Sequence, residues 1–421
     1  MNHYRFPDTK ITGICMFLYL MALQMVARST MYTSLFLGFL PAQMIMLGLV
    51  GAGGLGFLIY HRSKLRQILT DSRVLVVLGF ALVILGNMVI KQDWKLIYFS
   101  MFLYIGFAVF LSYFLTLEEA AGHYVGILFF FSVLTLLGQF VLKPLANMGI
   151  IPGFPFDSPG GWHMYNFGLT FAVNKNTEMV DALRVFGIFR EPGLFQVFLF
   201  IAIHLNNYNV RWDKEWKMWA VNAVLFLTLL ITFCTGGVVA MAMYIVFLFF
   251  DKGMHKNKKL LFLAIAAVAA GICVIVYAIA KGGTWAMELV WMIQKVFEKT
   301  DSYTTRMDSV FVNARTFLAH PLIGEKIETV MYSLENNTAS SPILFASFGI
   351  VGGCVHVLSW VALAWKKERH WIMNVILLVI LFMPFNTQNV VHDMFFWTFP
   401  VIALTQWCVP RLEEIKMKKK V

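Results

Sequence analysis

Two arginines six positions apart, Arg184 and Arg190, stand shortly before the apolar run Val197–Ile203. Charged side chains beside a helix of membrane length are costly to place, so they usually have a function there. Glu191 and Pro192 follow Arg190, and proline at the first helical position loses no hydrogen bond, which predicts a helix that begins at Pro192. The N–H groups and positive dipole end of that helix would then lie beside the arginines and favour a phosphate or another anion. Alternatively, the arginines extend into the lipid headgroups and bind nothing specific.

A second group of polar residues recurs at helical spacing further along the chain. Its members would share one face of a helix: Arg306, Ser309, Asn313, Thr316 and His320. Phe311 and Leu318 would lie on the opposite face, and Arg315 on a flank. Pro321 and Gly324 would end the helix, since proline cannot continue it and glycine allows the turn. The alternative is an ordinary amphipathic helix on the membrane surface.

Together the two stretches supply four arginines, and arginine binds phosphate groups through paired hydrogen bonds. If a diphosphate is the leaving group of a reaction, the same guanidinium groups stabilise the charge that grows in the transition state. Such a reaction still needs a base for the attacking hydroxyl, and Glu191 is the first candidate, with His320 and His392 behind it. His392 has the alternative role of a hydrogen-bonded histidine at the membrane interface. The sequence has no P-loop, and no metal-ligand motif accompanies these residues, so we expect no metal and no cofactor.

The composition is that of a membrane protein. Of the 421 residues, 59% are hydrophobic and only 14% charged, whereas soluble domains are nearer a quarter charged. The formal net charge of +11 comes from short basic clusters between apolar runs. That is the positive-inside pattern of membrane proteins, and we expect no nucleic-acid partner. The five cysteines fall singly in or beside apolar segments, which indicates buried thiols.

We expect an all-α polytopic membrane protein with about twelve transmembrane helices, forming a single integral membrane domain over residues 1–421. A spanning helix needs roughly 20 apolar residues. The candidate segments are Ile11–Ala27, Leu37–Tyr60, Val74–Ile90, Leu96–Leu115, Val125–Leu142, Pro192–Leu205, Met218–Phe233, Val238–Phe250, Leu260–Ala280, Pro342–Trp365, Trp371–Phe385 and Met394–Val409.

Lysine and arginine gather in alternate connections, which predicts that both termini are cytoplasmic. The connection 117–123, with its glutamates, is an exception in this basic set. Two long segments, 143–191 and 281–341, would then be extracytoplasmic loops and would hold the functional site. We expect them to form re-entrant or interfacial helices at the outer end of the bundle. No internal repeat is visible, which disfavours a transporter built from inverted repeats.

Three segments, in this order, resemble the O-antigen polymerase and O-antigen ligase superfamily of bacterial envelope enzymes. Residues 184–192 read RVFGIFREP and resemble the R-x-x-G-x-F-x-E-P signature that precedes a membrane helix in many polymerases. Arg306 and residues 320–324 (HPLIG) resemble part of the large extracytoplasmic loop. Asn336-Asn337 and residues 348–352 (FGIVG) resemble the family's H-N…G-x-x-G segment.

Two departures from the family pattern favour a polymerase over a ligase. Ligases typically carry a histidine where this chain has Asn336, and Ser-Arg where it has Thr235-Gly236-Gly237. Both missing groups are ones to which ligase chemistry is attributed. The ligase reading stays as the alternative. A transporter for lipid-linked sugars is a further one, but the middles of the apolar runs hold few ionisable residues, His204 and His356 among them.

The resemblance implies a GT-C-like glycosyltransferase in the bacterial cytoplasmic (inner) membrane. It would transfer a glycan from undecaprenyl pyrophosphate onto a lipid-linked repeat unit at the periplasmic face. Arg184, Arg190, Arg306 and Arg315 would bind the pyrophosphates, and Glu191 would be the base or orient an arginine. His320, Asn336 and His392 would help to bind substrate. The expected partners are the lipid-linked oligosaccharide, membrane lipid, a chain-length regulator and a flippase.

Overall fold

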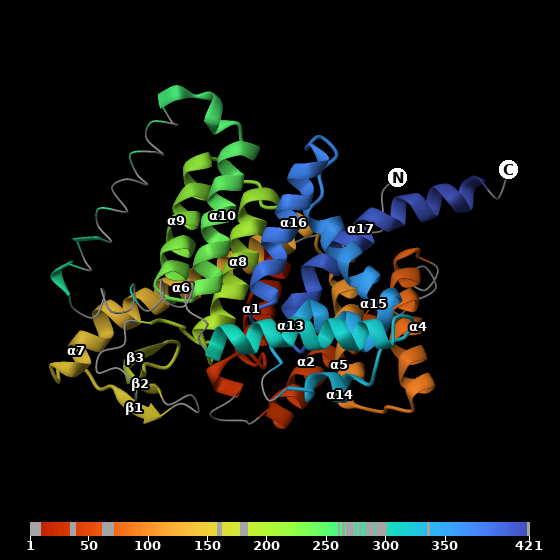
Figure 1. Cartoon of the computed structure of the whole chain (residues 1–421), viewed down its shortest axis with the longest axis horizontal. Helices are drawn as coiled ribbons and strands as arrows, with labels where there is room; N and C mark the ends of the chain where they lie inside the picture. Colours follow the sequence, from red (N-terminus) through yellow and green to blue (C-terminus); the bar gives the residue numbers. More distant parts are fainter. Residues whose placement is uncertain are drawn as a thin grey trace.

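The computed structural model describes residues 10–33, 39–60, 71–157, 162–176, 184–259, 301–334 and 337–418, with scattered positions between 262 and 290. The described chain is mostly helical, with one small sheet, as Figure 1 shows. The sheet, α13 (Asp301–Ala319) and α14 (Ile327–Met331) lie at the lower end of the bundle in that view. The connections that follow α10 and α15 lie at the upper end.

Each predicted apolar segment except Leu260–Ala280 contains a helix, and that segment lies outside the described residues apart from single positions. The helices are α1 (Lys10–Met25), α2 (Phe39–Tyr60), α4 (Arg73–Lys91), α5 (Leu96–Leu111), α6 (Leu117–Leu137), α8 (Pro192–Tyr208), α9 (Glu215–Leu230), α10 (Thr235–Asp251), α15 (Ser340–Ala364), α16 (Trp371–Phe385) and α17 (Met394–Lys418). A π-helical turn (Gly138–Leu142) and α7 (Lys143–Asn147) extend α6.

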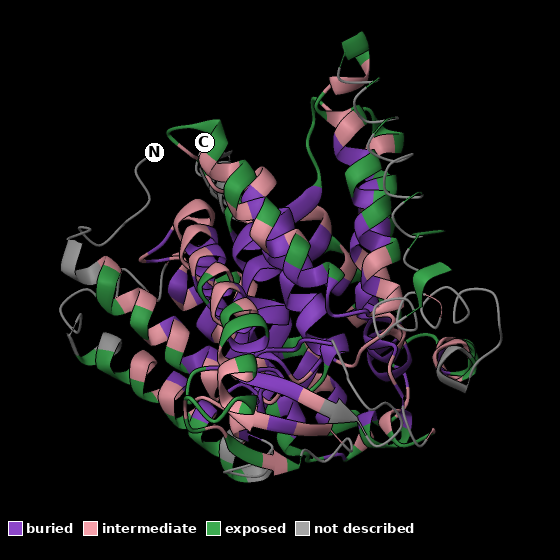
Figure 2. Ribbon diagram, turned by 90° about the vertical axis from the view of Figure 1, so that its left-hand side faces the viewer, coloured by how far each residue is buried: buried purple, intermediate pink, exposed green. Residues whose placement is uncertain are grey.

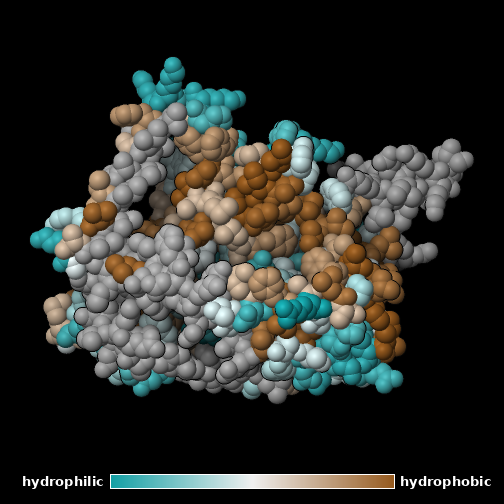
Figure 3. All heavy atoms as spheres, in the orientation of Figure 1, coloured by the Kyte–Doolittle hydropathy of each residue, from teal (hydrophilic) through white to brown (hydrophobic). Residues whose placement is uncertain are grey.

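Three helices of the described chain are long and apolar enough to cross a membrane: Arg73–Lys91, Leu117–Asn147 and Ser340–Ala364. Large apolar side chains are also exposed on the outside of the bundle, among them Leu82 (76%) and Val379 (55%). Figure 3 shows hydrophobic residues gathered across the middle of the molecule and hydrophilic ones near its upper and lower ends. This distribution suits a helical protein surrounded by lipid. The count of twelve spans stays a prediction.

The buried centre of the bundle contains α8, which is buried along Pro192–Asn206. Figure 2 shows the buried residues gathered inside the bundle and the exposed ones around it. A helix that is apolar on every side is stable only when neighbours cover all of it. For α8 the covering helices are α6, α9, α10 and α16. The first turn of α8 is therefore held rigidly at one end of the bundle.

The predicted connection 117–123 is wrong, because these residues form the first turns of α6. Thr116 caps the helix: its hydroxyl accepts from the Glu119 N–H, and the Glu119 carboxylate accepts from the Thr116 N–H at 2.8 Å. This reciprocal pair is a capping box. Glu118 and Glu119 thus stabilise a helix N-terminus.

The first long segment contains a sheet, where we expected re-entrant or interfacial helices. Strands β1 (Phe154–Asp157), β2 (Trp162–Asn166) and β3 (Phe171–Asn176) form an antiparallel sheet in the order β1-β2-β3. Each run is short and contains at least one aromatic residue, and Gly/Pro-containing clusters separate the runs, which favours strands over helix. The buried Gln139 side chain bonds the backbone N–H and C=O of Val173, and so fixes the sheet to the end of α6.

The second long segment contains α13, as expected, and its polar face is turned toward the protein. Ser309 and Asn313 are fully buried, whereas Phe311 and Leu318 are 56% and 73% exposed. Figure 1 shows α13 running across the direction of α8, α9 and α10. This placement agrees with an amphipathic helix whose apolar side contacts lipid.

The turn after α13 packs backbone to backbone against a break in α15. Gly349 interrupts α15 with φ 62° and ψ −162°. Gly324 has φ 68°, and a Cβ at either glycine would clash with the backbone of the other segment. Ile350 N–H donates to the Pro321 carbonyl at 2.8 Å, and Glu325 N–H donates to the Ala346 carbonyl at 2.7 Å. The two glycines therefore allow this segment to dock on α15.

Candidate functional site

A cavity of about 80 Å³ lies where three segments far apart in the sequence meet. They are the turn after α1 (Arg28 and Ser29), the start of α8 and the connection between α16 and α17. The lining residues are Arg28, Ser29, Arg190, Leu194, Asn389, Val390, His392 and Asp393. It combines two arginines, a histidine and an acid, which makes it the best candidate for a functional site in the described chain.

Backbone pairing holds Arg28 and Arg190 on two neighbouring turns of the chain. Thr30 and Phe189 form an isolated antiparallel bridge. Arg190 N–H donates to the Ser29 carbonyl at 3.0 Å, and the N–H of Met31 donates to the carbonyl of Ile188 at 2.7 Å. The two stretches are about 160 residues apart in sequence, so only the fold brings these arginines to one cavity.

The start of α8 forms another part of the wall, and the predicted first residue of this helix is confirmed. Glu191 has an extended backbone (φ −148°, ψ 145°), and Pro192 is the first helical residue. Leu194 in the first turn lines the cavity. The positive end of a 17-residue helix therefore lies beside the two arginines and favours an anion there.

Asp393 closes the cavity from the third segment. Its Oδ2 accepts a hydrogen bond of 2.7 Å from the Ser29 hydroxyl, and its Oδ1 accepts one of 3.1 Å from the N–H of Phe395. The residue is only 3% exposed. Asp393 thus connects the turn after α1 to the first turn of α17.

The charged and titratable groups of the cavity affect one another. Burial, and then the nearby Arg190, lowers the pKa of Arg28. Burial, followed by the two arginines, lowers the pKa of His392 to about 3, so this imidazole is neutral at pH 7. Burial raises the pKa of Asp393 to about 6, although its hydrogen bonds and Arg190 act in the opposite direction. Two guanidinium groups near each other favour a bound anion, since an anion between them offsets their repulsion.

Two of the residues predicted from sequence, Arg190 and His392, line this cavity together. Glu191 adjoins it: its Oε1 lies 3.8 Å from the Nε of Arg190, and its side chain is half exposed. Arg184 is buried, 8% exposed, and is not a lining residue. The next residue, Val185, donates its N–H to the carbonyl of Ile231.

The residues predicted on α13 and after it do not line the cavity. Arg306 is partly buried and Arg315 is exposed. The exposed His320 has its Nε2 at 3.3 Å from Glu325 Oε2. Asn336 lies outside the described residues. Whether Arg306 and Arg315 share a substrate with Arg190 therefore stays a prediction.

A chain of amide side chains nevertheless joins α13 to the edge of the cavity. The amides of Asn313 and Asn337 bond each other at 2.8 and 3.1 Å. Asn389, a lining residue, donates to the carbonyl of Asn337 at 3.3 Å. Met331 at the end of α14 lies against His392, with 3.2 Å between its sulfur and Nε2. The segment after α13 therefore helps to position the residues of the cavity.

Sequence reasoning missed Arg28, Ser29 and Asp393, although two of them carry a signal. Arg28 directly follows the apolar run Ile11–Ala27, just as Arg190 shortly precedes another. Asp393 directly precedes the apolar run that begins at Met394, where an acid caps a helix. Ser29 has no such signal, because its role depends on a partner 364 positions away.

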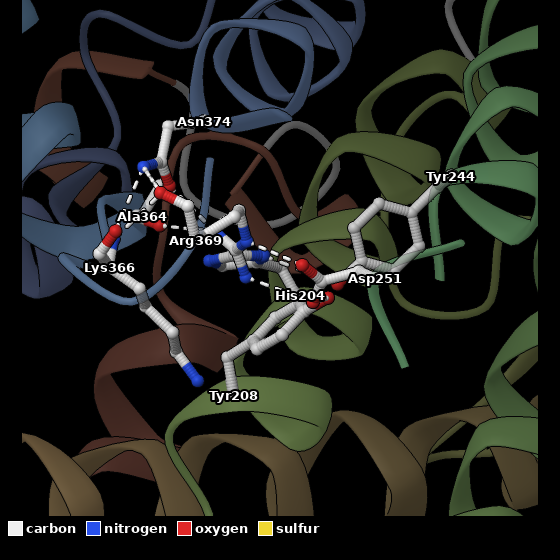
Figure 4. A network of polar contacts seen from close by, with 8 residues as sticks. All are labelled: His204, Tyr208, Tyr244, Asp251, Ala364, Lys366, Arg369 and Asn374. Atoms are coloured by element: carbon white, nitrogen blue, oxygen red, sulfur yellow. Dashed lines mark hydrogen bonds and ion pairs between the residues drawn. The ribbon is translucent and has the colours of Figure 1, made fainter. Parts of the chain in front are cut away.

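A second polar cluster lies at the other end of α8, as Figure 4 shows. Arg369 donates to both carboxylate oxygens of Asp251, at 2.6 and 3.1 Å, and to Asn374 at 3.0 Å. The hydroxyl of Tyr208 donates to Asp251 at 2.6 Å. These groups form hydrogen bonds and an ion pair with one another. We therefore assign the cluster a structural role: it connects α8 and α10 to the segment between α15 and α16.

In comparisons with known proteins, no family model matches the chain, and no curated protein sequence matches it significantly.

Proposed function

We propose that this protein is a polysaccharide polymerase of the bacterial cytoplasmic membrane, acting on O-antigen or capsular repeat units. It would transfer a glycan from undecaprenyl pyrophosphate onto a lipid-linked repeat unit at the periplasmic face. The reaction would require no metal and no cofactor. A flippase that delivers the repeat units and a chain-length regulator would be its partners.

The observation that carries this proposal is the pair of guanidinium groups, Arg28 and Arg190, on one small cavity beside the start of α8. A diphosphate is a suitable occupant, because arginine binds phosphate oxygens in pairs and the helix dipole adds attraction. As the bond to the sugar breaks, negative charge grows on the diphosphate, and fixed positive groups stabilise it most at that moment. The resemblance of residues 184–192 to the polymerase signature supports the same reading.

The cavity lies at the end of the bundle that carries the sheet, α13 and α14. The basic connections after α10 and α15 lie at the opposite end. Under the positive-inside rule, this arrangement supports a periplasmic cavity and a cytoplasmic C-terminal helix end. It would then lie at the depth of the lipid headgroups, where a diphosphate attached to a membrane-embedded lipid is found.

The proposal is tested in a strain that lacks the gene, complemented with variants of the protein, with glycan length read from a gel. Loss of the ladder with one repeat unit still attached indicates a polymerase, whereas loss of every unit indicates a ligase. We expect Arg190→Gln and Arg28→Gln to lose the ladder. Arg211→Gln is the matched control, since the Arg211 side chain is 87% exposed and follows the other end of α8. Full-length polymer from both cavity variants would refute the proposal.

A further inference from the structure

We infer that Asp393 is the base that takes the proton from the attacking sugar hydroxyl. This inference rests on the proposed function and replaces the assignment of Glu191. It starts from the position of Asp393, which lines the same cavity as Arg28 and Arg190. A base must lie within hydrogen-bond reach of the proton it removes, so a residue on the wall of the cavity has the required access.

The hydrogen bonds of Asp393 leave it able to accept a proton. Ser29 donates to one carboxylate oxygen and the Phe395 N–H to the other. An ionised carboxylate has about four lone-pair sites, so two donors leave acceptor capacity on both oxygens. The two bonds come from different segments and fix the orientation of the carboxylate, which is what a positioned base requires.

The other candidate bases are less suitable. The half-exposed Glu191 does not line the cavity, and its carboxylate lies 3.8 Å from the Nε of Arg190. His392 lines the cavity, but burial, and then the two arginines, disfavours its protonated form, and its Nε2 lies against the sulfur of Met331. His320 lies beside Glu325 and outside the cavity. Among these candidates, Asp393 therefore combines a place on the cavity wall with a carboxylate whose pKa is raised, so it is the most suitable base.

The proton transfer balances in a single displacement. The hydroxyl oxygen of the lipid-linked acceptor forms a bond to the anomeric carbon of the donor, and its proton passes to Asp393. The bond from that carbon to the diphosphate oxygen breaks, and the diphosphate leaves with the electron pair. Arg28 and Arg190 then stabilise the released charge. A diphosphate beside Asp393 also makes the carboxylate more basic, since neighbouring negative charges favour the protonated form.

The inference predicts a rate that rises with pH as Asp393 ionises. Charged and titratable groups face it from each element packed against it: Arg28 after α1, Tyr104 of α5, Tyr124 of α6, Arg190 before α8, and His392 on its own segment. Burial raises the pKa of Asp393 to about 6, so the carboxylate form dominates at neutral pH and can act as a base there.

The test compares two measurements on Asp393→Asn: binding of undecaprenyl pyrophosphate to the purified protein in detergent, and the rate of chain extension in membranes that contain lipid-linked repeat units. We expect extension at least about 100-fold slower, because a positioned base contributes that much or more. Binding should be retained or become tighter, since a negative charge beside the diphosphate has been removed. Arg211→Gln is the control and should keep wild-type extension, because the exposed Arg211 side chain follows the far end of α8.

The outcomes separate this inference from the proposed function. If Asp393→Asn extends chains at more than about a tenth of the wild-type rate while Arg190→Gln does not, Asp393 is not the base and the polymerase proposal stands. If the Arg190→Gln protein also extends chains at the wild-type rate, the proposed function itself is wrong.

A second variant keeps the inference testable if Asp393→Asn does not fold. Ser29→Ala removes a hydrogen bond that stabilises the carboxylate form, so it should raise the pKa of Asp393. The acid limb of the rate profile should then move to higher pH. An unmoved limb in a folded Ser29→Ala protein would overturn the inference.

Discussion

Replacing Asp393 with asparagine should stabilise the folded protein at neutral and alkaline pH. Burial raises the pKa of this carboxyl from 3.8 to about 6. A carboxyl group with a raised pKa contributes stability below its unfolded pKa, and this contribution is lost as the pH rises through the folded value. The wild type should therefore become less stable between about pH 4 and pH 6 because of Asp393, and remain so above that range.

The size of the effect follows from the shift. A change of about 2 pKa units corresponds to roughly 3 kcal/mol in the free energy of unfolding. Asparagine carries no charge at any of these pH values and can still accept a hydrogen bond through its side-chain oxygen. Asp393→Asn should therefore be more stable than wild type by up to about 3 kcal/mol at pH 8, and by much less near pH 4.

The assay is denaturant unfolding of the detergent-solubilised protein, followed by tryptophan fluorescence at several pH values from 4 to 8. Asp251→Asn is the control, because the Asp251 carboxylate is bonded to the buried Arg369. Its loss leaves that guanidinium without its anion, so this variant should be destabilised by about 3–5 kcal/mol. A destabilised Asp393→Asn at pH 8, or a stability difference that does not change with pH, would refute the reasoning.

Two further predictions concern the elements that support the site. Gly349→Ala should cost about 3 kcal/mol or more in unfolding free energy, because the backbone there suits glycine and the new Cβ would lie 2.2 Å from the carbonyl oxygen of Leu322. Gly51→Ala is the control and should be tolerated, because no atom lies within 4 Å of a Cβ added there. Equal yields and equal unfolding curves for the two glycine variants would contradict this prediction. Thr116→Ala should destabilise the protein by about 1 kcal/mol through loss of the α6 cap. Denaturant unfolding measures this, and an unchanged midpoint would argue against the cap.

The helices could be predicted because their signals are local. Long apolar runs, and proline at the first position of α8, each mark a helix without reference to the rest of the chain. The start of α6 was missed although its signal was also local, since Thr116 and Glu119 have the spacing of a capping box. The apolar run that begins at Val125 predicts a later start of the helix, which leaves Glu118 and Glu119 in the connection before it.

The sheet and half of the cavity depended on contacts that no local pattern contains. Val173 of β3 is tied to Gln139, and nothing in the sequence marks these two as partners. Arg190 was predicted from its neighbours in sequence, but its pairing with Ser29 comes from the return of the chain to the end of α1. Asp393 is buried because two distant segments, the turn after α1 and the start of α8, pack against its own, and the same burial raises its pKa.

The central claim, that Arg28 and Arg190 hold a diphosphate, is tested most directly by titrating the purified protein with undecaprenyl pyrophosphate in detergent. Each arginine should contribute charge-assisted hydrogen bonds of about 1.5–3 kcal/mol, so Arg28→Gln and Arg190→Gln should each weaken binding roughly 10- to 150-fold. Arg211→Gln should leave binding unchanged, since its exposed side chain follows the far end of α8. Equal affinities for the wild type and both cavity variants would contradict the account.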